Sequence, residues 1–235
     1  MEMTSAMNFK KSFDFGDVLG YGWRTMKANL WFFVGIGIIG SLIVYLPMII
    51  NIIQEKLPLS EPAHIILRIT MQILGQLAGI IMGIGLIKIA LSFCDERRPS
   101  VGTLFAAAGC FWRYIGAAIL YMLIVIGGIL LLIVPGIIWA IKYRYCFYFV
   151  IDKGLGPIEA LKASNKTTMG VKWELFALGI VCGAINLLGL LCLIVGIFAA
   201  YPIALVASAL VYRQLAAQTF GPAVNEQVYP DNGGL

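Results

Sequence analysis

Long apolar runs separated by short polar stretches dominate the chain. A helix needs about 20 mainly apolar residues to cross the hydrocarbon core of a bilayer. The run from residue 173 to residue 215 is too long for one crossing, so it predicts a hairpin with a turn near residues 190–196. A second turn is expected at Pro135-Gly136, between two apolar runs. The pattern therefore predicts an all-α polytopic membrane protein with six spans, at about 30–53, 64–93, 114–134, 137–151, 174–190 and 196–215.

Three shorter segments are too short or too polar to span. In the first, apolar positions from Phe15 to Met26 recur at helical spacing, with Asp17, Arg24 and Lys27 elsewhere on the wheel. Residues 101–111 follow Ser100, which is suited to an N-cap. We expect three helices lying in the membrane interface; for the first, a solvent-exposed helix is the alternative.

The third interfacial segment covers residues 156–169. Its apolar residues Ile158, Leu161 and Met169 are expected to face lipid. Its charged residues, Glu159, Lys162 and Lys166, are expected to face water. The loop after residue 54 carries Pro58 and Pro62, which are expected to exclude helix there.

We expect the chain to divide into a polar tail (1–14), one membrane domain (15–217) and a disordered tail (218–235). Within the domain, the units 15–93, 100–152 and 156–215 share a plan. In each, a surface helix leads to a tryptophan and then to a helical hairpin; the tryptophans are Trp31, Trp112 and Trp173. The similarity has two interpretations: a threefold helix-hairpin repeat, or the common use of tryptophan and cations at membrane surfaces.

Composition supports the membrane class. The chain is 60% hydrophobic and only 12% charged, against about 25% charged residues in soluble domains. The net charge of +5 is spread over loops, so it indicates topology and attraction to anionic lipid headgroups rather than nucleic-acid binding. The five cysteines form no CxxC pair and the chain has one histidine, so no metal site and no cofactor is expected.

Basic residues gather on one side of the predicted topology. The opposite side holds only Lys56 and, at its border, Arg68. The positive-inside rule places both termini in the cytoplasm. The cytoplasmic cations are Lys10, Lys11, Arg24, Lys27, Arg97, Arg98, Arg113, Lys153, Lys162, Lys166, Lys172 and Arg213.

Two stripes follow the second predicted span. Arg68, Gln72 and Gln76 recur every four residues after His64 and share one face. This polar stripe either lines a pathway or bonds a neighbouring helix or the headgroup layer. The second stripe, called the glycine stripe, consists of Gly75, Gly79 and Gly83, and the fifth span carries a similar glycine pair. Both are small-residue surfaces that a neighbouring helix backbone can approach closely. These helix-packing glycines are Gly75, Gly79, Gly83, Gly179 and Gly183.

Lys142 and Arg144 lie within the fourth predicted span. Placing their charges in a membrane costs free energy. Either they snorkel to the cytoplasmic headgroups, or they form a site for a lipid headgroup or an anionic substrate. Their candidate partners are Asp152, Glu159 and lipid phosphate.

Catalytic patterns are missing from the sequence. Apart from Glu174, the first residue of the fifth predicted span, no acidic residue lies in a predicted span, and no HExxH, GxSxG or GxxxxGK[ST] motif occurs. We therefore expect a non-enzymatic membrane scaffold, or a protein that binds lipids or partners. The alternative is a transporter, channel or lipid-handling protein that uses the polar stripe with Lys142 and Arg144.

One stretch resembles a known family. The pattern LLLIVPGII…FVIDKGLGPIEALKASNKTTMG over residues 130–170, followed by Trp173, Ala200-Tyr201-Pro202 and Val211-Tyr212-Arg213, resembles a largely uncharacterised group of multi-pass bacterial membrane proteins. That group is related to the membrane domain fused to some glycerophosphoryl diester phosphodiesterases. The resemblance implies an inner-membrane protein with six helices. The phosphodiesterase catalytic domain has no counterpart here, so its activity is not implied.

Overall fold

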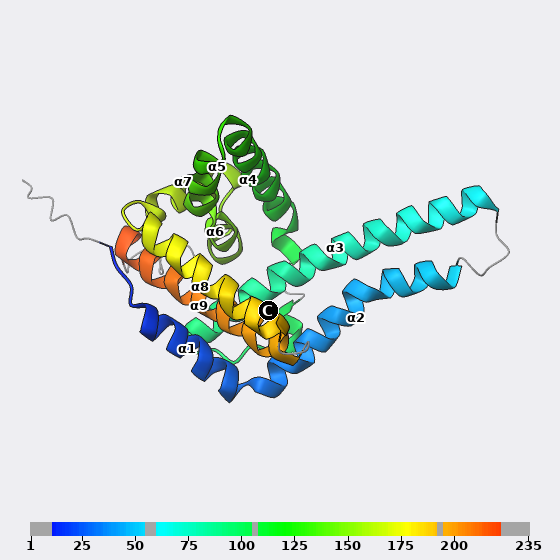
Figure 1. Cartoon of the computed structure of the whole chain (residues 1–235), viewed down its shortest axis with the longest axis horizontal. Coiled ribbons are helices and arrows are strands. Elements are labelled where there is room, and N and C mark those ends of the chain that lie inside the picture. The colour runs from blue at the N-terminus through cyan, green and yellow to red at the C-terminus, as the bar shows by residue number, and fades with distance from the viewer. Residues whose placement is uncertain (1–10, 55–59, 105–107, 192–194, 222–235) are drawn as a thin grey trace, which may run out of the picture.

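A computed structural model describes residues 11–54, 60–104, 108–191 and 195–221, and every regular element in those ranges is a helix (Figure 1). The α-helices are α1 (Phe15–Ala28), α2 (Leu30–Gln54), α3 (Glu61–Cys94), α4 (Phe111–Leu131), α5 (Ile133–Tyr143), α6 (Cys146–Lys153), α7 (Pro157–Thr168), α8 (Lys172–Leu191) and α9 (Val195–Phe220). Two short 3₁₀ helices, η1 (Val101–Leu104) and η2 (Ala108–Cys110), precede α4.

Five helices in the described part are long and apolar enough to cross a membrane: α2, α3, α4, α8 and α9. Their outward surfaces are covered with large aliphatic side chains, as a lipid-facing surface would be. The all-α architecture and these five spans agree with the sequence prediction, and they suggest a membrane protein.

The fourth predicted span, 137–151, is not one helix. α5 ends at Tyr143 and α6 begins at Cys146, so the two helices are only about 16 Å and 12 Å long at 1.5 Å per residue. The turn before α5 also differs from its prediction. It lies at Leu132, whose backbone is extended, whereas Pro135 and Gly136 lie in the first turn and a half of α5. Proline is tolerated there because its missing N–H would have no partner in the helix.

Three further helix boundaries differ from those predicted from the sequence. Pro62 does not exclude helix; it occupies the first turn of α3, where proline is favoured. The expected helix over 101–111 is present as η1 and η2, with residues 105–107 outside the described part. α9 continues to Phe220, and the Gln218 side chain bonds both backbone groups of Ser12, so the C-terminal tail does not begin at residue 218. Residues 222–235 and 1–10 of the expected tails lie outside the described part.

The first expected surface helix packs on protein. The face of α1 formed by Val18, Gly22 and Met26 is buried, and α1 lies along α9 (Figure 1). A Cβ on Gly22 would lie 2.8 Å from the carbonyl oxygen of Ile203, so glycine permits this close approach. The apolar face of α1 is therefore not available to lipid.

α7 is also inserted among helices. Leu161 is only 7% exposed, whereas Ile158 and Met169 are 61% and 58% exposed. The prediction that Leu161 faces lipid is therefore wrong. The buried face of α7 packs against α4, α5, α6 and α9.

The hairpins are attached to a common core. Buried aromatic rings of α6 and α9 meet there, with Tyr148 stacked on Tyr212 at 5.2 Å between ring centroids. The α8–α9 hairpin is tight because Gly189 and Gly196 leave room for each other's backbone. In contrast, the outer half of the α2–α3 hairpin projects as an arm (Figure 1). The first and third proposed repeat units have a short α-helix before the hairpin, but the middle unit has 3₁₀ turns, so the threefold repeat stays a prediction.

Candidate functional site

The polar stripe of α3 faces α2. Gln72 and Gln76 line a cleft of about 330 Å³ between the two helices, opposite Met48 and Asn51. Arg68 lies one turn closer to the start of α3 and is exposed. Lys142 and Arg144 lie on the other side of the core, at the junction of α5 and α6. The structure therefore does not bring the stripe and the two cations together.

The three glycines of the α3 stripe, Gly75, Gly79 and Gly83, differ in their surroundings. A Cβ on Gly75 would lie 2.8 Å from Cγ of Pro47 on α2, so this glycine does permit close packing. Gly79 and Gly83 have no atom within 4 Å of their Cβ positions. The prediction that Gly79 and Gly83 pack a neighbouring backbone is therefore wrong. Gly85, which the sequence analysis did not single out, is buried against η1 instead.

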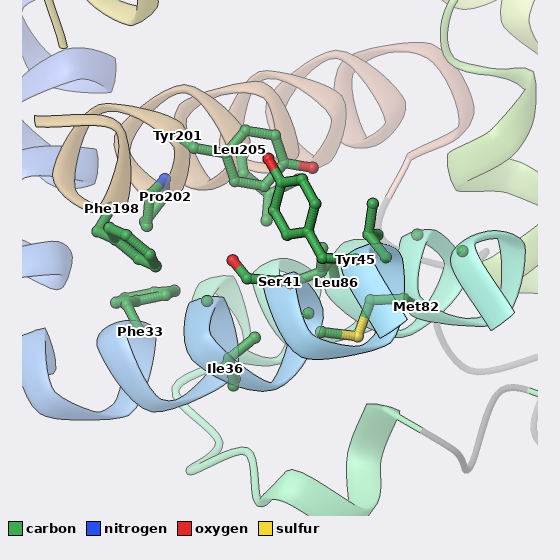
Figure 2. Close-up of a pocket in the computed structure, with 15 residues that line it drawn as sticks. Phe33, Ile36, Ser41, Tyr45, Met82, Leu86, Phe198, Tyr201, Pro202 and Leu205 are labelled. Atoms are coloured by element: carbon green, nitrogen blue, oxygen red, sulfur yellow. The ribbon is translucent and has the colours of Figure 1, made fainter. Parts of the chain in front are cut away.

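The open side of Gly79 and Gly83 borders a cavity of about 400 Å³ between α2, α3 and α9 (Figure 2). Its walls are mainly apolar side chains, and Gly37 and Gly40 belong to the α2 wall. In Figure 2, Tyr45 projects from α2 toward Tyr201 of α9. The lining residues are Phe33, Ile36, Gly37, Gly40, Ser41, Val44, Tyr45, Gly79, Met82, Gly83, Leu86, Phe198, Tyr201, Pro202 and Leu205.

This cavity adjoins the polar cleft, because both are lined by Val44 and Gly79. Together they form a space along the α2–α3 hairpin that is apolar next to α9 and polar farther out. Its size is within the range of small-molecule sites, about 300–1,000 Å³. The arrangement suits a molecule with an apolar part and a polar part.

At the junction of α5 and α6, the last turn of α5 is capped from α7. The carbonyl oxygen of Lys142 accepts hydrogen bonds from Ser164 Oγ at 2.9 Å and from Thr168 Oγ1 at 3.0 Å. These hydroxyls serve a carbonyl that a continuous helix would pair with a backbone N–H. The Lys142 ammonium lies 5.0 Å from the centre of the Tyr143 ring. The sequence signal that could have found this contact is the i, i+4 spacing of Ser164 and Thr168 on the buried face of α7.

Arg144 extends between α8 and α9. Its Nη2 lies 3.5 Å from Ser208 Oγ, and its Nη1 lies 3.4 Å from the Cβ position of Gly179. Gly179 therefore leaves room for the guanidinium rather than for a helix backbone, and Gly183 faces open space. The packing prediction is wrong for both glycines.

The expected carboxylate partners of the two cations are engaged elsewhere. Glu159 Oε2 accepts a hydrogen bond from the N–H of Gly156 and so caps α7. Asp152 Oδ2 accepts hydrogen bonds from Arg213 Nη1 at 2.7 Å and from the Tyr212 hydroxyl at 2.8 Å. Neither acid pairs with Lys142 or Arg144 in the described part of the chain.

Sequence reasoning missed the cluster around Arg213. Besides Asp152, the guanidinium binds Asp95 at the end of α3, with 2.6 Å between Nη2 and Oδ2. Lys153 lies 3.5 Å from the same Asp152 oxygen. One arginine on α9 thus joins the ends of α3 and α6. No local pattern pairs Arg213 with these acids, because Asp95 and Asp152 are 118 and 61 residues away.

Two titratable groups tie the N-terminal segment to the rest. The Tyr21 hydroxyl donates to the carbonyl of Phe93 at 2.7 Å, and burial raises the pKa of this phenol, which keeps it a donor. The Lys11 ammonium donates to the carbonyl of Lys166 at the end of α7. Burial lowers the pKa of Lys11. Both contacts hold structure rather than forming a reactive centre.

Across the residues that the structure describes, no group of three or more His, Cys, Asp or Glu side chains could hold a metal ion. Comparison with protein-family models, with curated proteins and with solved structures finds no match to this chain. A function for this chain is therefore argued from the arrangement of its own side chains.

Proposed function

We propose that the protein is a non-enzymatic integral membrane protein that binds lipid, and that an acyl chain occupies the cavity between α2, α3 and α9. The observation that carries the proposal is the open, apolar space beside Gly79 and Gly83. All three surrounding helices are long and apolar enough to span a membrane. The molecules that reach such a space from within a bilayer are lipids, whose acyl chains can contact the apolar walls by van der Waals packing.

The polar end of the space favours a lipid over a purely apolar ligand. Gln72 and Gln76 provide amide groups in the adjoining cleft, and Ser41 and Tyr45 bring hydroxyls to the cavity wall. Such groups can bond the ester or headgroup oxygens of a lipid.

The transport alternative finds less support. It needs the polar stripe and the two cations along one path, but Gln72 and Gln76 line the α2–α3 cleft, whereas Arg144 lines a groove of α4, α5 and α8.

We also propose that the protein lies in the bacterial inner membrane with both termini in the cytoplasm, and that α5 and α6 together form a sixth membrane segment. The resemblance over residues 130–170 and the distribution of cations support this topology.

The test uses a phospholipid with a photoreactive group at the end of one acyl chain, reconstituted with the protein. After irradiation, peptide mass spectrometry locates the adducts. We expect an adduct on Met82, which lines the cavity and is only 8% exposed, and Gly83→Leu should abolish it by filling the space. Gly183→Leu is the matched control, because that Cβ position is equally open but outside the cavity. Adducts confined to outward residues such as Leu123 would contradict the proposal.

A further inference from the structure

Arg144 lies in a second, separate groove. The groove measures about 440 Å³, runs between α4, α5 and α8, and is lined by Arg144 and by mainly apolar side chains, among them Ile137, Ile141, Leu175 and Ile180. None of its lining residues borders the cavity of Figure 2. Arg144 is the only ionisable lining group other than Tyr121.

The charge of Arg144 is not balanced by a carboxylate. No Asp or Glu oxygen among the described residues lies within 4.0 Å of its guanidinium, and its one polar contact is the long bond to Ser208. Arg213, by contrast, is paired with two carboxylates. A cation within a membrane segment is costly unless an anion or water compensates it. The guanidinium offers five donors, and a planar fork of two suits a phosphate.

Arg144 lies below the membrane surface but short of the centre of the bilayer. Gly179, beside the guanidinium, is seven residues after Lys172, which is about 10 Å along α8. Lys172 and the exposed Trp173 are typical of a membrane surface. At about 10 Å from that surface, the guanidinium therefore lies short of the centre of a core about 30 Å thick, at a depth where an uncompensated charge is costly.

We infer that Arg144 binds the phosphate of an anionic membrane lipid, whose acyl chains lie against the apolar walls of the α4–α5–α8 groove. The inference rests on the proposed membrane embedding, but it uses residues that the acyl-chain cavity does not. Charge complementarity selects the lipid: the groove supplies one unpaired cation and an apolar surface, and an anionic phospholipid supplies the opposite charge and apolar chains.

Native mass spectrometry of the delipidated full chain tests the inference, with dioleoyl phosphatidylglycerol and dioleoyl phosphatidylcholine as probes. The wild type should bind the anionic lipid about tenfold more tightly. Both probes carry a phosphate, but the choline ammonium of phosphatidylcholine offsets the phosphate charge that Arg144 meets, whereas phosphatidylglycerol has no such cation. Arg144→Gln should remove that preference. Arg24→Gln, which removes an exposed charge on α1, should keep it.

A second pair of variants keeps the test independent of any misfolding of Arg144→Gln. Gly179→Leu retains the arginine but fills the groove beside it, so it should weaken phosphatidylglycerol binding about tenfold. Gly183→Leu, one turn farther along α8, should not. Glycerol 3-phosphate in large excess should not displace the lipid, because it lacks chains to contact the walls.

Three results would overturn the inference: an unchanged lipid preference in both Arg144→Gln and Gly179→Leu, an equal loss in the two control variants, or full competition by glycerol 3-phosphate. Loss of acyl-chain adducts in the cavity of Figure 2 would not bear on it. Retained adducts together with a lost anionic preference would separate the two proposals.

Discussion

Arg213 on α9 donates a 2.7 Å hydrogen bond from Nη1 to Oδ2 of Asp152 in the last turn of α6. The side chains are 22% and 10% exposed, so the pair is shielded from water more than a surface ion pair. Through its other nitrogen the same guanidinium reaches Asp95 after α3. The ends of α3 and α6, which are far apart in the sequence, therefore depend on one cation of α9.

Replacing Asp152 by Asn should destabilise the protein by about 2 kcal/mol, between the values for exposed and fully buried pairs. The cause is that Arg213 loses one of its two charged partners while the Tyr212 hydroxyl loses a charged acceptor. Unfolding in detergent micelles, followed by circular dichroism, measures the change. Arg24→Gln, at an exposed position, should change stability by less than about 0.5 kcal/mol. Equal stability of Asp152→Asn and wild type would mean that the cluster is not a clamp.

Ser164 and Thr168 should act non-additively, because their hydroxyls share the carbonyl of Lys142. Each single alanine variant should lose about 1 kcal/mol, since the other hydroxyl still serves the carbonyl. The double variant leaves this acceptor without its α7 donors and should lose about 3 kcal/mol, more than the sum. The same detergent unfolding experiment on four proteins completes the cycle. A strictly additive result would show that the two hydroxyls do not act on one acceptor.

The length of apolar runs explains which elements were predictable. Spans 30–53, 64–93, 174–190 and 196–215 match α2, α3, α8 and α9 within a few residues, apart from the extension of α9, because spanning length alone defines them. The break at Arg144 was not predictable in this way. It depends on hydroxyls of α7, which are supplied by the tertiary fold and not by the local sequence.

Glycine spacing showed which residues share a face of α3, but not what that face meets. Gly75 and Gly79 are one turn apart, yet one contacts Pro47 and the other borders a cavity. Periodicity contains no information on how far two helices separate along their length. For the same reason the sequence identified Arg144 as a costly cation but could not assign Asp152 to Arg213 instead.

Gly85 and Gly79 should respond to alanine with opposite signs. A Cβ on Gly85 would lie 2.5 Å from the carbonyl oxygen of Leu104, so Gly85→Ala forces η1 away from α3 and should cost about 1–3 kcal/mol. Gly79→Ala meets no atom within 4 Å and should gain about 0.5–1 kcal/mol from the lower flexibility of alanine. Unfolding midpoints of the two variants give the comparison. A similar loss in both would mean that Gly79 is packed against a neighbour after all.

The proposed orientation predicts opposite labelling of two introduced cysteines. Position 97 follows α3 on the side that carries most of the cations, and its side chain is exposed; position 56 lies in the segment that joins α2 and α3. In a variant whose five native cysteines are replaced by alanine, Lys56→Cys should react with a membrane-impermeant maleimide in intact spheroplasts. Arg97→Cys should react only after the membrane is opened by detergent, because the positive-inside rule places it in the cytoplasm. Labelling of position 97 from outside, with position 56 protected, would invert the topology. It would also move the Arg144 groove to the outer leaflet, so the lipid that reaches it would come from the other half of the bilayer.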